Sequence, residues 1–543
     1  MRRSFDVVVL GSEPDALVAA TGLATCGVRV LLLEPGPDLG GIYREIEFAP
    51  GWRAAPLVPD LGYLDPQAFR GMAEIHASVA ADPTVIALGE GGPLALWRSA
   101  VETAAALRRL SARDAERWPK FVQQLASLAG FLATLFRDAA PRVDARAIDE
   151  FLTLLRLGRQ YRSLGRRGMV ELLRALPISA ADWLDDFFES EPLKGALAAL
   201  AVTDLCQGPM SGGTALAFLH RHVGAAPGVI GERLRLKAGP GALIDALARR
   251  ARAAGVAIET QGAVVELSVR DGRIESAALA SGEAIACRAV ISALDPYQSL
   301  LGLIDPVHLD PVLIEAVRNI RFRGVTTKIL LALDALPDSV AAATAAATTT
   351  TTTTTATTTA TASAGAAGTM LIAPSMRYVE RAFDATKYGR CSSEPFVMIH
   401  LPSAVHAGLA PPGKHVAVLH VQYTPYRLRE GEWGELRDTV AERALRVVEA
   451  HLPGFTSRVR ERMVLSPVDL ESRFGLREGA VSRGELALDQ LLFMRPVPDL
   501  AGHAAPVVGL HLCGAGTHPG PGIVGASGRM AARAALKELR ARA

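Results

Sequence analysis

The sequence predicts an α/β fold, in which a doubly wound parallel sheet carries an inserted domain of helices and a second sheet. Three distant segments carry this prediction. Residues 5–34 have the pattern of strand, turn, helix and strand, residues 289–296 form another buried strand, and residues 511–532 form a strand, a glycine-rich loop and a helix. Apolar strands that alternate with helices are typical of parallel sheets covered on both faces.

The first unit has the pattern of a dinucleotide-binding turn. An apolar run ends at Gly11, a small-residue helix follows, and a second buried strand ends in Glu34, where a ribose hydroxyl would be held. Glu13 and Ala16 stand where G-x-G-x-x-G has its second and third glycines. The second glycine normally lets the backbone approach a pyrophosphate, and a carboxylate at Glu13 would compete for the same helix N–H groups. Outward rotation of Glu13 would relieve this competition.

Length and composition narrow the class of protein. With 543 residues the chain is too long for one hydrophobic core, and 58 Lys and Arg against 56 Asp and Glu do not favour nucleic acid as a partner. Five scattered cysteines without a C-x-x-C pair favour neither zinc nor a disulfide framework. The first strand begins near Phe5, and no apolar run reaches the roughly 18 residues of a membrane span. We therefore expect a cytoplasmic protein, with peripheral membrane contact as an alternative, and predict no oligomeric state.

The predicted domains alternate along the chain. Residues 1–75, 225–300 and 491–543 are assigned to the nucleotide-binding domain, residues 76–224 to a mostly helical substrate or cap domain, and residues 301–490 to a substrate domain of sheet and helices. Residues 341–367 are almost only Ala and Thr, which predicts a low-complexity loop, with a threonine-rich interaction strand as the alternative. His220 and His222 lie close together, but no further residue has metal-ligand spacing, so no metal site is predicted.

The C-terminal segment has the sharpest pattern. Residues 511–532 form a strand, a loop rich in Gly and Pro, and a helix. Such a loop offers free backbone N–H groups and a positive helix end to an anionic or electron-rich group.

Together these segments resemble a known family, the phytoene-desaturase-like flavoproteins. Within it the chain is most similar to the subgroup called pyridine nucleotide-disulfide oxidoreductase domain-containing protein 2. The resemblance implies an FAD/NAD(P)-binding domain (Rossmann-like, glutathione-reductase-type), built from three segments, with an inserted α+β substrate domain. It also implies FAD as cofactor. The motifs that carry it are residues 187–194, 378–384, 410–416, 465–471, 484–496 and 514–528.

The resemblance also assigns cofactor-binding residues. Gly11, Ser12, Glu13 and Ala16 fall on the phosphate turn, Glu34 on the ribose acid, Gly40 and Gly41 on a glycine pair near the phosphates, and Val264 on the strand that meets the adenine. The residues that fall on the flavin loop are Gly514, Ala515, Gly516, Thr517, His518, Pro519, Gly522 and Ile523. Three departures stand out, namely Glu13, the lack of a basic residue ahead of Gly40, and Arg483 where the subgroup commonly has His.

These features predict an FAD-dependent oxidoreductase that removes hydride from a small apolar or amphipathic substrate. His518 and Arg483 are the predicted catalytic residues, with Arg483 holding an anionic substrate group or stabilising reduced flavin. A loop-structuring histidine and a solvated surface arginine are the alternatives for these two. The alternative function is a non-catalytic binding or scaffold protein that lost FAD through Glu13.

Overall fold

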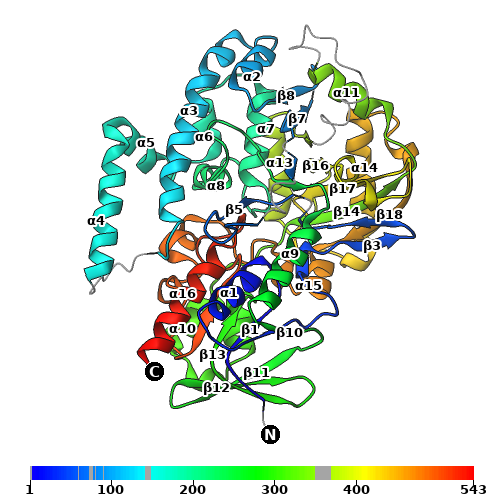
Figure 1. Cartoon of the computed structure of the whole chain (residues 1–543). Helices are drawn as coiled ribbons and strands as arrows, with labels where there is room; N and C mark the ends of the chain where they lie inside the picture. The colour runs from blue at the N-terminus through cyan, green and yellow to red at the C-terminus, as the bar shows by residue number, and fades with distance from the viewer. Residues whose placement is uncertain are drawn as a thin grey trace.

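The computed structural model describes residues 3–58, 60–72, 78–79, 81–89, 91–140, 148–348 and 368–542. Figure 1 shows the sheet that contains the N-terminal strand at one end of the molecule, and a second sheet with a group of helices at the other. Among the described residues, no helix is both long and apolar enough to cross a membrane.

The first sheet is built around β1, as the sequence predicts. Val8 lies opposite Leu31 of β2 and Val290 of β13, and both pairings are parallel. The strand order is β10-β2-β1-β13-β12-β11, and β19 pairs with β13 beyond the end of β12. The bounds are β1 (Ser4–Leu10), β2 (Val30–Leu33), β10 (Ala257–Glu259), β11 (Val264–Arg270), β12 (Arg273–Leu279), β13 (Ala284–Ser292) and β19 (Leu510–Leu512).

Both faces of β1 are buried because its apolar run has no polar side. Val7 and Val9 pack with residues of α1, α9 and α16, whereas Val8 and Leu10 pack with β12 and α10 on the other face. Successive side chains of a strand point to opposite faces, so a continuous apolar run requires covers on both. The bounds are α1 (Pro14–Ala24), α9 (Pro240–Ala253), α10 (Pro311–Arg318) and α16 (Ala526–Ala541).

The predicted helical region forms a separate group of helices around an aromatic core. Ser111 caps α3 by accepting a hydrogen bond from the N–H of Asp114 at 3.1 Å, and serine is a preferred residue at this position. Trp118, Phe121 and Trp183 are buried in this core. The bounds are α2 (Ala100–Leu107), α3 (Ala112–Leu135), α4 (Ile148–Ser163), α5 (Gly165–Ala175), α6 (Ala180–Asp185), α7 (Glu191–Val202) and α8 (Thr214–Arg221).

The second sheet has the order β18-β14-β17-β16-β15-β7-β8 and is covered by α14. Residues 85–96 supply β7 and β8, although the sequence places them in the helical region; β7 joins the sheet by parallel pairing with β15. The bounds are β7 (Val85–Leu88), β8 (Leu94–Leu96), β14 (Thr326–Leu333), β15 (Thr369–Ile372), β16 (Val397–His400), β17 (His415–Gln422), β18 (Val459–Leu465), α13 (Met376–Lys387), α14 (Trp433–His451) and α15 (Pro467–Phe474).

The Ala/Thr-rich segment begins with a helix. Asp338–Thr348 form α11, so the prediction of a loop is wrong for residues 341–348, because alanine is the strongest helix former. Residues 349–367, the rest of the predicted loop, lie outside the described residues.

Three pairs of short strands are described outside the two large sheets. β5 pairs in parallel with β20, which places Tyr63 opposite Ile523. The other pairs are the hairpin of β3 with β4 and the antiparallel pair of β6 with β9. The bounds are β3 (Ile46–Ala49), β4 (Trp52–Ala54), β5 (Tyr63–Leu64), β6 (Ser78–Val79), β9 (Arg235–Leu236) and β20 (Ile523–Val524).

The contact between α1 and α16 depends on a glycine. A Cβ added to Gly528 would clash with the main-chain carbonyl of Asp15. We expect Gly528→Ala to lower the free energy of unfolding by roughly 1–3 kcal/mol, the usual cost of overpacking. Gly130→Ala in α3 is the control, because its Cβ meets no atom within 4 Å and alanine favours helix. Thermal unfolding of both variants tests this, and equal melting temperatures would contradict it.

Candidate active site

A cavity of about 580 Å³ extends from the N-terminus of α1 to the second sheet. Glu13 and Asp15 line it at the α1 end, and Lys328 and His420 line it at the sheet. Between these two ends the cavity runs along the C-terminal loop and β5. The βαβ unit, the helical group and the second sheet all contribute residues to its wall. Its volume falls within the usual range of ligand pockets.

The two departures at Glu13 and Arg483 meet in one buried ion pair. Arg483 Nη2 donates to Glu13 Oε1, and the side chains are only 9% and 13% exposed. Arg483 Nη1 also donates to the carbonyl of Ala293 at 2.6 Å. Burial raises the pKa of Glu13, and the Arg483 charge opposes this shift. The guanidinium therefore neutralises the carboxylate that replaces the expected glycine.

The pairing turns the Glu13 side chain away from the N-terminus of α1. Glu13 is the N-cap residue, but its side chain makes no capping hydrogen bond. Among the described residues, no hydrogen bond uses the N–H groups of Asp15 and Ala16. Gly41 permits this arrangement, because a Cβ there would lie 3.1 Å from Glu13 Oε1. Free N–H groups at a helix N-terminus form an anion-binding site.

The predicted ribose acid lies next to the phosphate turn. Glu34 is buried, accepts a hydrogen bond from Ser12 Oγ, and accepts another from the N–H of Gly36 at 3.0 Å. Ser12 Oγ in turn accepts one from the N–H of Gly40 at 2.7 Å. The strand that carries Val264 is adjacent, since Gly262 donates its N–H to the carbonyl of Glu34. The residues predicted for the adenosine end therefore lie together.

The C-terminal loop is fixed from within. Thr517 Oγ1 and the N–H of Gly514 both bond Ser527 Oγ, at 2.6 and 2.9 Å. Gly522 lies so close to Gly62 that a Cβ on Gly62 would clash with the Gly522 carbonyl. Of the predicted loop residues, Ala515, Gly522 and Ile523 line the cavity. Gly514, Gly516 and Thr517 lie behind this lining surface.

Arg495, which the sequence did not single out, holds the loop in place. Its buried guanidinium donates to the carbonyls of Ser482 and Ala515, both at 2.7 Å, and to three further carbonyls. Burial lowers its pKa to about 9. The residue links the segment that carries Arg483 to the flavin loop, and nothing in its local sequence indicates this role.

His518 lies away from the cavity, contrary to the catalytic role predicted for it. It is buried, its ring packs edge-on against Phe136, and its Nε2 lies 3.2 Å from the carbonyl of Asp138. Burial lowers its pKa to about 4. These contacts fasten the loop to the end of α3. His220 and His222 likewise bond backbone carbonyls of Pro519 and Phe218.

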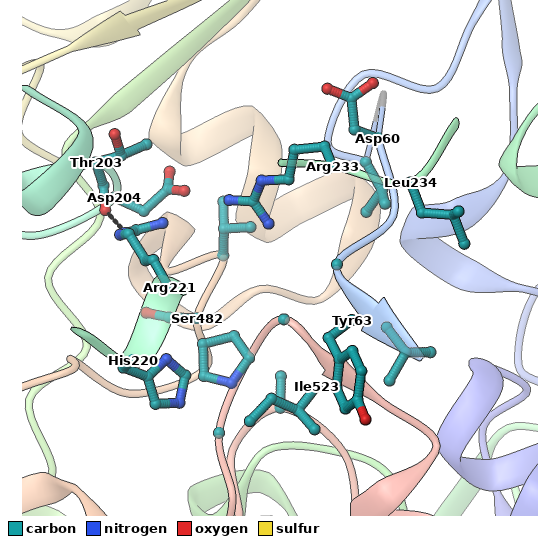
Figure 2. Close-up of a pocket in the computed structure, with 18 of the residues that line it drawn as sticks. Asp60, Tyr63, Thr203, Asp204, His220, Arg221, Arg233, Leu234, Ser482 and Ile523 are labelled. Atoms are coloured by element: carbon teal, nitrogen blue, oxygen red, sulfur yellow. Dashed lines mark hydrogen bonds between the residues drawn. The ribbon is translucent and has the colours of Figure 1, made fainter. Parts of the chain in front are cut away.

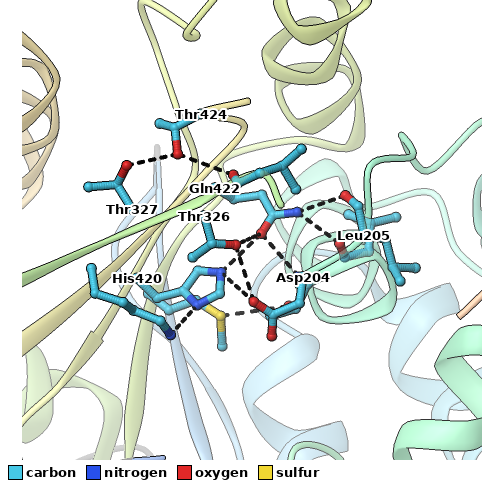
Figure 3. A network of polar contacts seen from close by, with 12 residues as sticks. Asp204, Leu205, Thr326, Thr327, His420, Gln422 and Thr424 are labelled. Atoms are coloured by element: carbon cyan, nitrogen blue, oxygen red, sulfur yellow. Dashed lines mark hydrogen bonds and ion pairs between the residues drawn. The ribbon is translucent and has the colours of Figure 1, made fainter. Parts of the chain in front are cut away.

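The sheet end of the cavity contains a polar network that the sequence did not reveal (Figure 3). Gln422 donates to the carbonyls of Val202 and Leu205, so its Oε1 accepts from His420 Nε2 at 3.0 Å. His420 Nδ1 is then free to accept from Lys328 Nζ at 2.8 Å. Burial lowers the pKa of Lys328, and burial with the Lys328 charge lowers that of His420 to about 3.

The comparisons with known proteins agree with this geometry. Residues 90–366, half of the chain, match the family described as flavin containing amine oxidoreductase. The chain is 32% identical over 566 residues to pyridine nucleotide-disulfide oxidoreductase domain-containing protein 2 of Rattus norvegicus, covering 99% of this chain and 94% of the relative. It is 25% identical over 309 residues to phytoene desaturase (lycopene-forming) of Pseudescherichia vulneris, covering 55% and 54%. An oxidoreductase structure from Methanosarcina mazei shares the fold, with a TM-score of 0.60, 16% identity, and coverage of 98% and 100%.

The chain therefore belongs to the flavin-containing amine oxidoreductases, in the group of pyridine nucleotide-disulfide oxidoreductase domain-containing protein 2. The predicted fold class is confirmed, and so is FAD as the cofactor of the family. The residues at the α1 end fit this cofactor. The N–H groups of Asp15 and Ala16 at the start of α1 are unused, Ser12 bonds both Glu34 and Gly40 beside them, and Arg483 cancels the charge of Glu13. The individual residue roles remain predictions.

The ion pair between Glu13 and Arg483 can be tested by removing one or both partners. Arg483→Ala leaves a buried carboxylate unpaired, which costs about 3–5 kcal/mol and places negative charge beside the pyrophosphate site. We expect a lower melting temperature and less bound FAD in this variant. Glu13→Gly/Arg483→Ala removes both charges and is expected to recover most of the flavin absorbance. A single variant as stable and as yellow as the parent would contradict the assignment.

Asp15 is a further acid at the α1 end, half-buried in the cavity wall. Burial raises its pKa to about 7, although the N–H of Gly528 bonds its carboxylate. A folded-state pKa above the unfolded value contributes stability that is complete below about pH 4 and lost as the pH rises through 7. Asp15→Asn keeps the acceptor for Gly528 but not the titration. We expect its melting temperature to exceed the parent's by about 2 °C or more at pH 8, with a smaller gain at pH 5. An equal gain at both pH values would exclude this pKa.

Proposed function

We propose that this flavoprotein removes hydride from a small amphipathic substrate, desaturating or oxidising it. The observation that carries the proposal is one continuous cavity. It extends from Glu13 at the phosphate turn to a chamber beside the second sheet, where Lys328, Met398 and His420 form part of the wall. A cofactor held along the first part presents its reactive end to the second. FAD supplies the hydride acceptor, and the protein supplies position, a dry site and electrostatics.

The chamber walls are suited to the apolar part of a substrate. Leu200, Leu205 and Met398 lie on the side of α7 and the second sheet, and Leu486 and Ile523 on the side of the C-terminal loop. Apolar walls exclude water, which protects a hydride in transit from competing reactions. The similarity to the phytoene desaturase also supports an apolar portion.

Lys328 is the residue that we assign to proton transfer. Loss of hydride from one atom of the substrate leaves a proton to be removed from its neighbour. Lys328 Nζ lines the cavity, and its lowered pKa favours the neutral amine that can accept a proton. His420 Nδ1 accepts a hydrogen bond from the same nitrogen and so fixes its direction.

A second candidate function is a non-catalytic binding protein that has lost FAD. The observation behind it is the carboxylate of Glu13 at the cavity wall beside the phosphate turn. It predicts that the cavity keeps its shape and that the cofactor end stays empty.

Colour distinguishes the two functions. We expect the purified protein to show the visible absorbance of oxidised flavin, or to acquire it when FAD is added and excess removed. Lys328→Met should retain this absorbance and lose roughly 100-fold or more in the rate of flavin reduction by substrate. Protein that stays colourless with excess FAD would exclude the oxidoreductase, and full reduction rates in Lys328→Met would exclude the proton-transfer role.

A further inference from the structure

The chamber contains more cationic side chains than acidic side chains that are free to pair with them. Arg221 and Arg233 both line it. Figure 2 shows the guanidinium of Arg233 reaching into the chamber toward the side where Arg221 and Asp204 lie. Among the described residues, no hydrogen bond or ion pair engages the Arg233 guanidinium.

Asp60 and Glu232, two other acids of the cavity wall, are committed elsewhere. Asp60 forms a two-point pair with Arg235, including Nη2 to Oδ2 at 2.8 Å, and its Oδ2 lies 3.4 Å from His400 Nδ1. Burial opposes the charged form of Asp60, but Arg235 and His400 hold its pKa well below its usual range. Glu232 pairs with Arg98. Neither carboxylate is free to neutralise Arg233.

Arg221 is only partly satisfied as well. It ends α8, donates from Nη2 to the carbonyl of Thr203, and leaves its buried Nε without a partner. Burial lowers its pKa to about 10, so that it remains charged at neutral pH. Asp204 is the acid beside it, and this one carboxylate also faces Lys328. One carboxylate thus stands beside two guanidinium groups.

We propose that Arg221 and Arg233 form an anion-binding site for the headgroup of the substrate, a carboxylate or a phosphate, whose apolar tail lies along the chamber wall. Buried cations need a paired anion, and guanidinium groups match both of these oxyanions. The chamber supplies the cations, and the ligand supplies the anion that pairs with them. This inference rests on the proposed function for the identity of the ligand as substrate.

The phosphates of the cofactor are another anion that arginines bind. The positions of the charged residues in the cavity distinguish a site for these phosphates from a site for the substrate headgroup. Arg221 donates to the carbonyl of Thr203, next to the Asp204 that bonds Thr326 of β14, and Arg233 points toward the same side of the cavity (Figure 2). Glu13 instead pairs with Arg483 at the start of α1. The two arginines therefore belong to the chamber and not to the phosphate turn.

Binding of model amphiphiles to the full chain tests the site without turnover. Isothermal titration calorimetry with decanoate and with decyl phosphate is compared with decan-1-ol, which has the tail and no charge. We expect at least one anion to bind at least tenfold more tightly than the alcohol. Arg233→Gln should weaken that anion about tenfold or more, whereas Arg233→Lys, which keeps the charge, should stay within about threefold. Arg233 has no hydrogen-bond or ion-pair partner within the described part of the chain, so we expect its variants to retain the fold, which thermal unfolding checks.

The controls separate this site from a general loss of charge and from cofactor binding. Arg318→Gln removes an exposed arginine of α10 and should leave the anion affinity unchanged. FAD content is measured by visible absorbance in every variant. Anion affinity that is unchanged in Arg233→Gln, or equal to that of decan-1-ol, overturns the proposal, as does a loss of FAD alone. Colourless protein whose anion binding still depends on Arg233 would refute the proposed function and leave this site standing.

Discussion

The ion pair between Glu13 and Arg483 is the interaction on which the cofactor end of the structure depends. A carboxylate at the start of α1 would by itself repel a pyrophosphate and claim the free N–H groups of the helix. Arg483 removes both effects, because it cancels the charge and draws the side chain away from the helix axis. The pair is almost fully buried, and a buried pair is costly to break on one side only.

That pair also ties together segments that are far apart in sequence. Residue 13 belongs to the first βαβ unit, and residue 483 belongs to the segment that Arg495 fastens to the C-terminal loop. The close approach of Gly62 to Gly522 adds a second connection between these regions. The position of the C-terminal loop is thus set by contacts among three segments.

The chamber differs in character from the phosphate turn. At the turn the Glu13 carboxylate is paired with Arg483, whereas the chamber holds two guanidinium groups beside the Asp204 carboxylate and next to apolar walls. The network from Gln422 through His420 to Lys328 fixes the direction of a buried amine. Water exclusion strengthens all of these electrostatic effects, since fields are screened less in a low-dielectric site. An amphipathic ligand is complementary to such a chamber in both of its parts.

The sequence by itself determined the elements whose patterns are local. The strands around β1 follow from apolar runs, and they form where they were predicted. The turn at Gly11 and the acid at Glu34 were likewise readable, because their spacing is set within one βαβ unit. Tertiary structure alone decided which long-range partners meet. It moved residues 85–96 into the second sheet, took His518 away from the cavity, paired Glu13 with Arg483, and brought Arg221, Arg233 and Lys328 to one chamber. A charged residue carries no local signal of its partner, since ion pairs depend on distance in space and on burial, which a one-dimensional pattern does not contain.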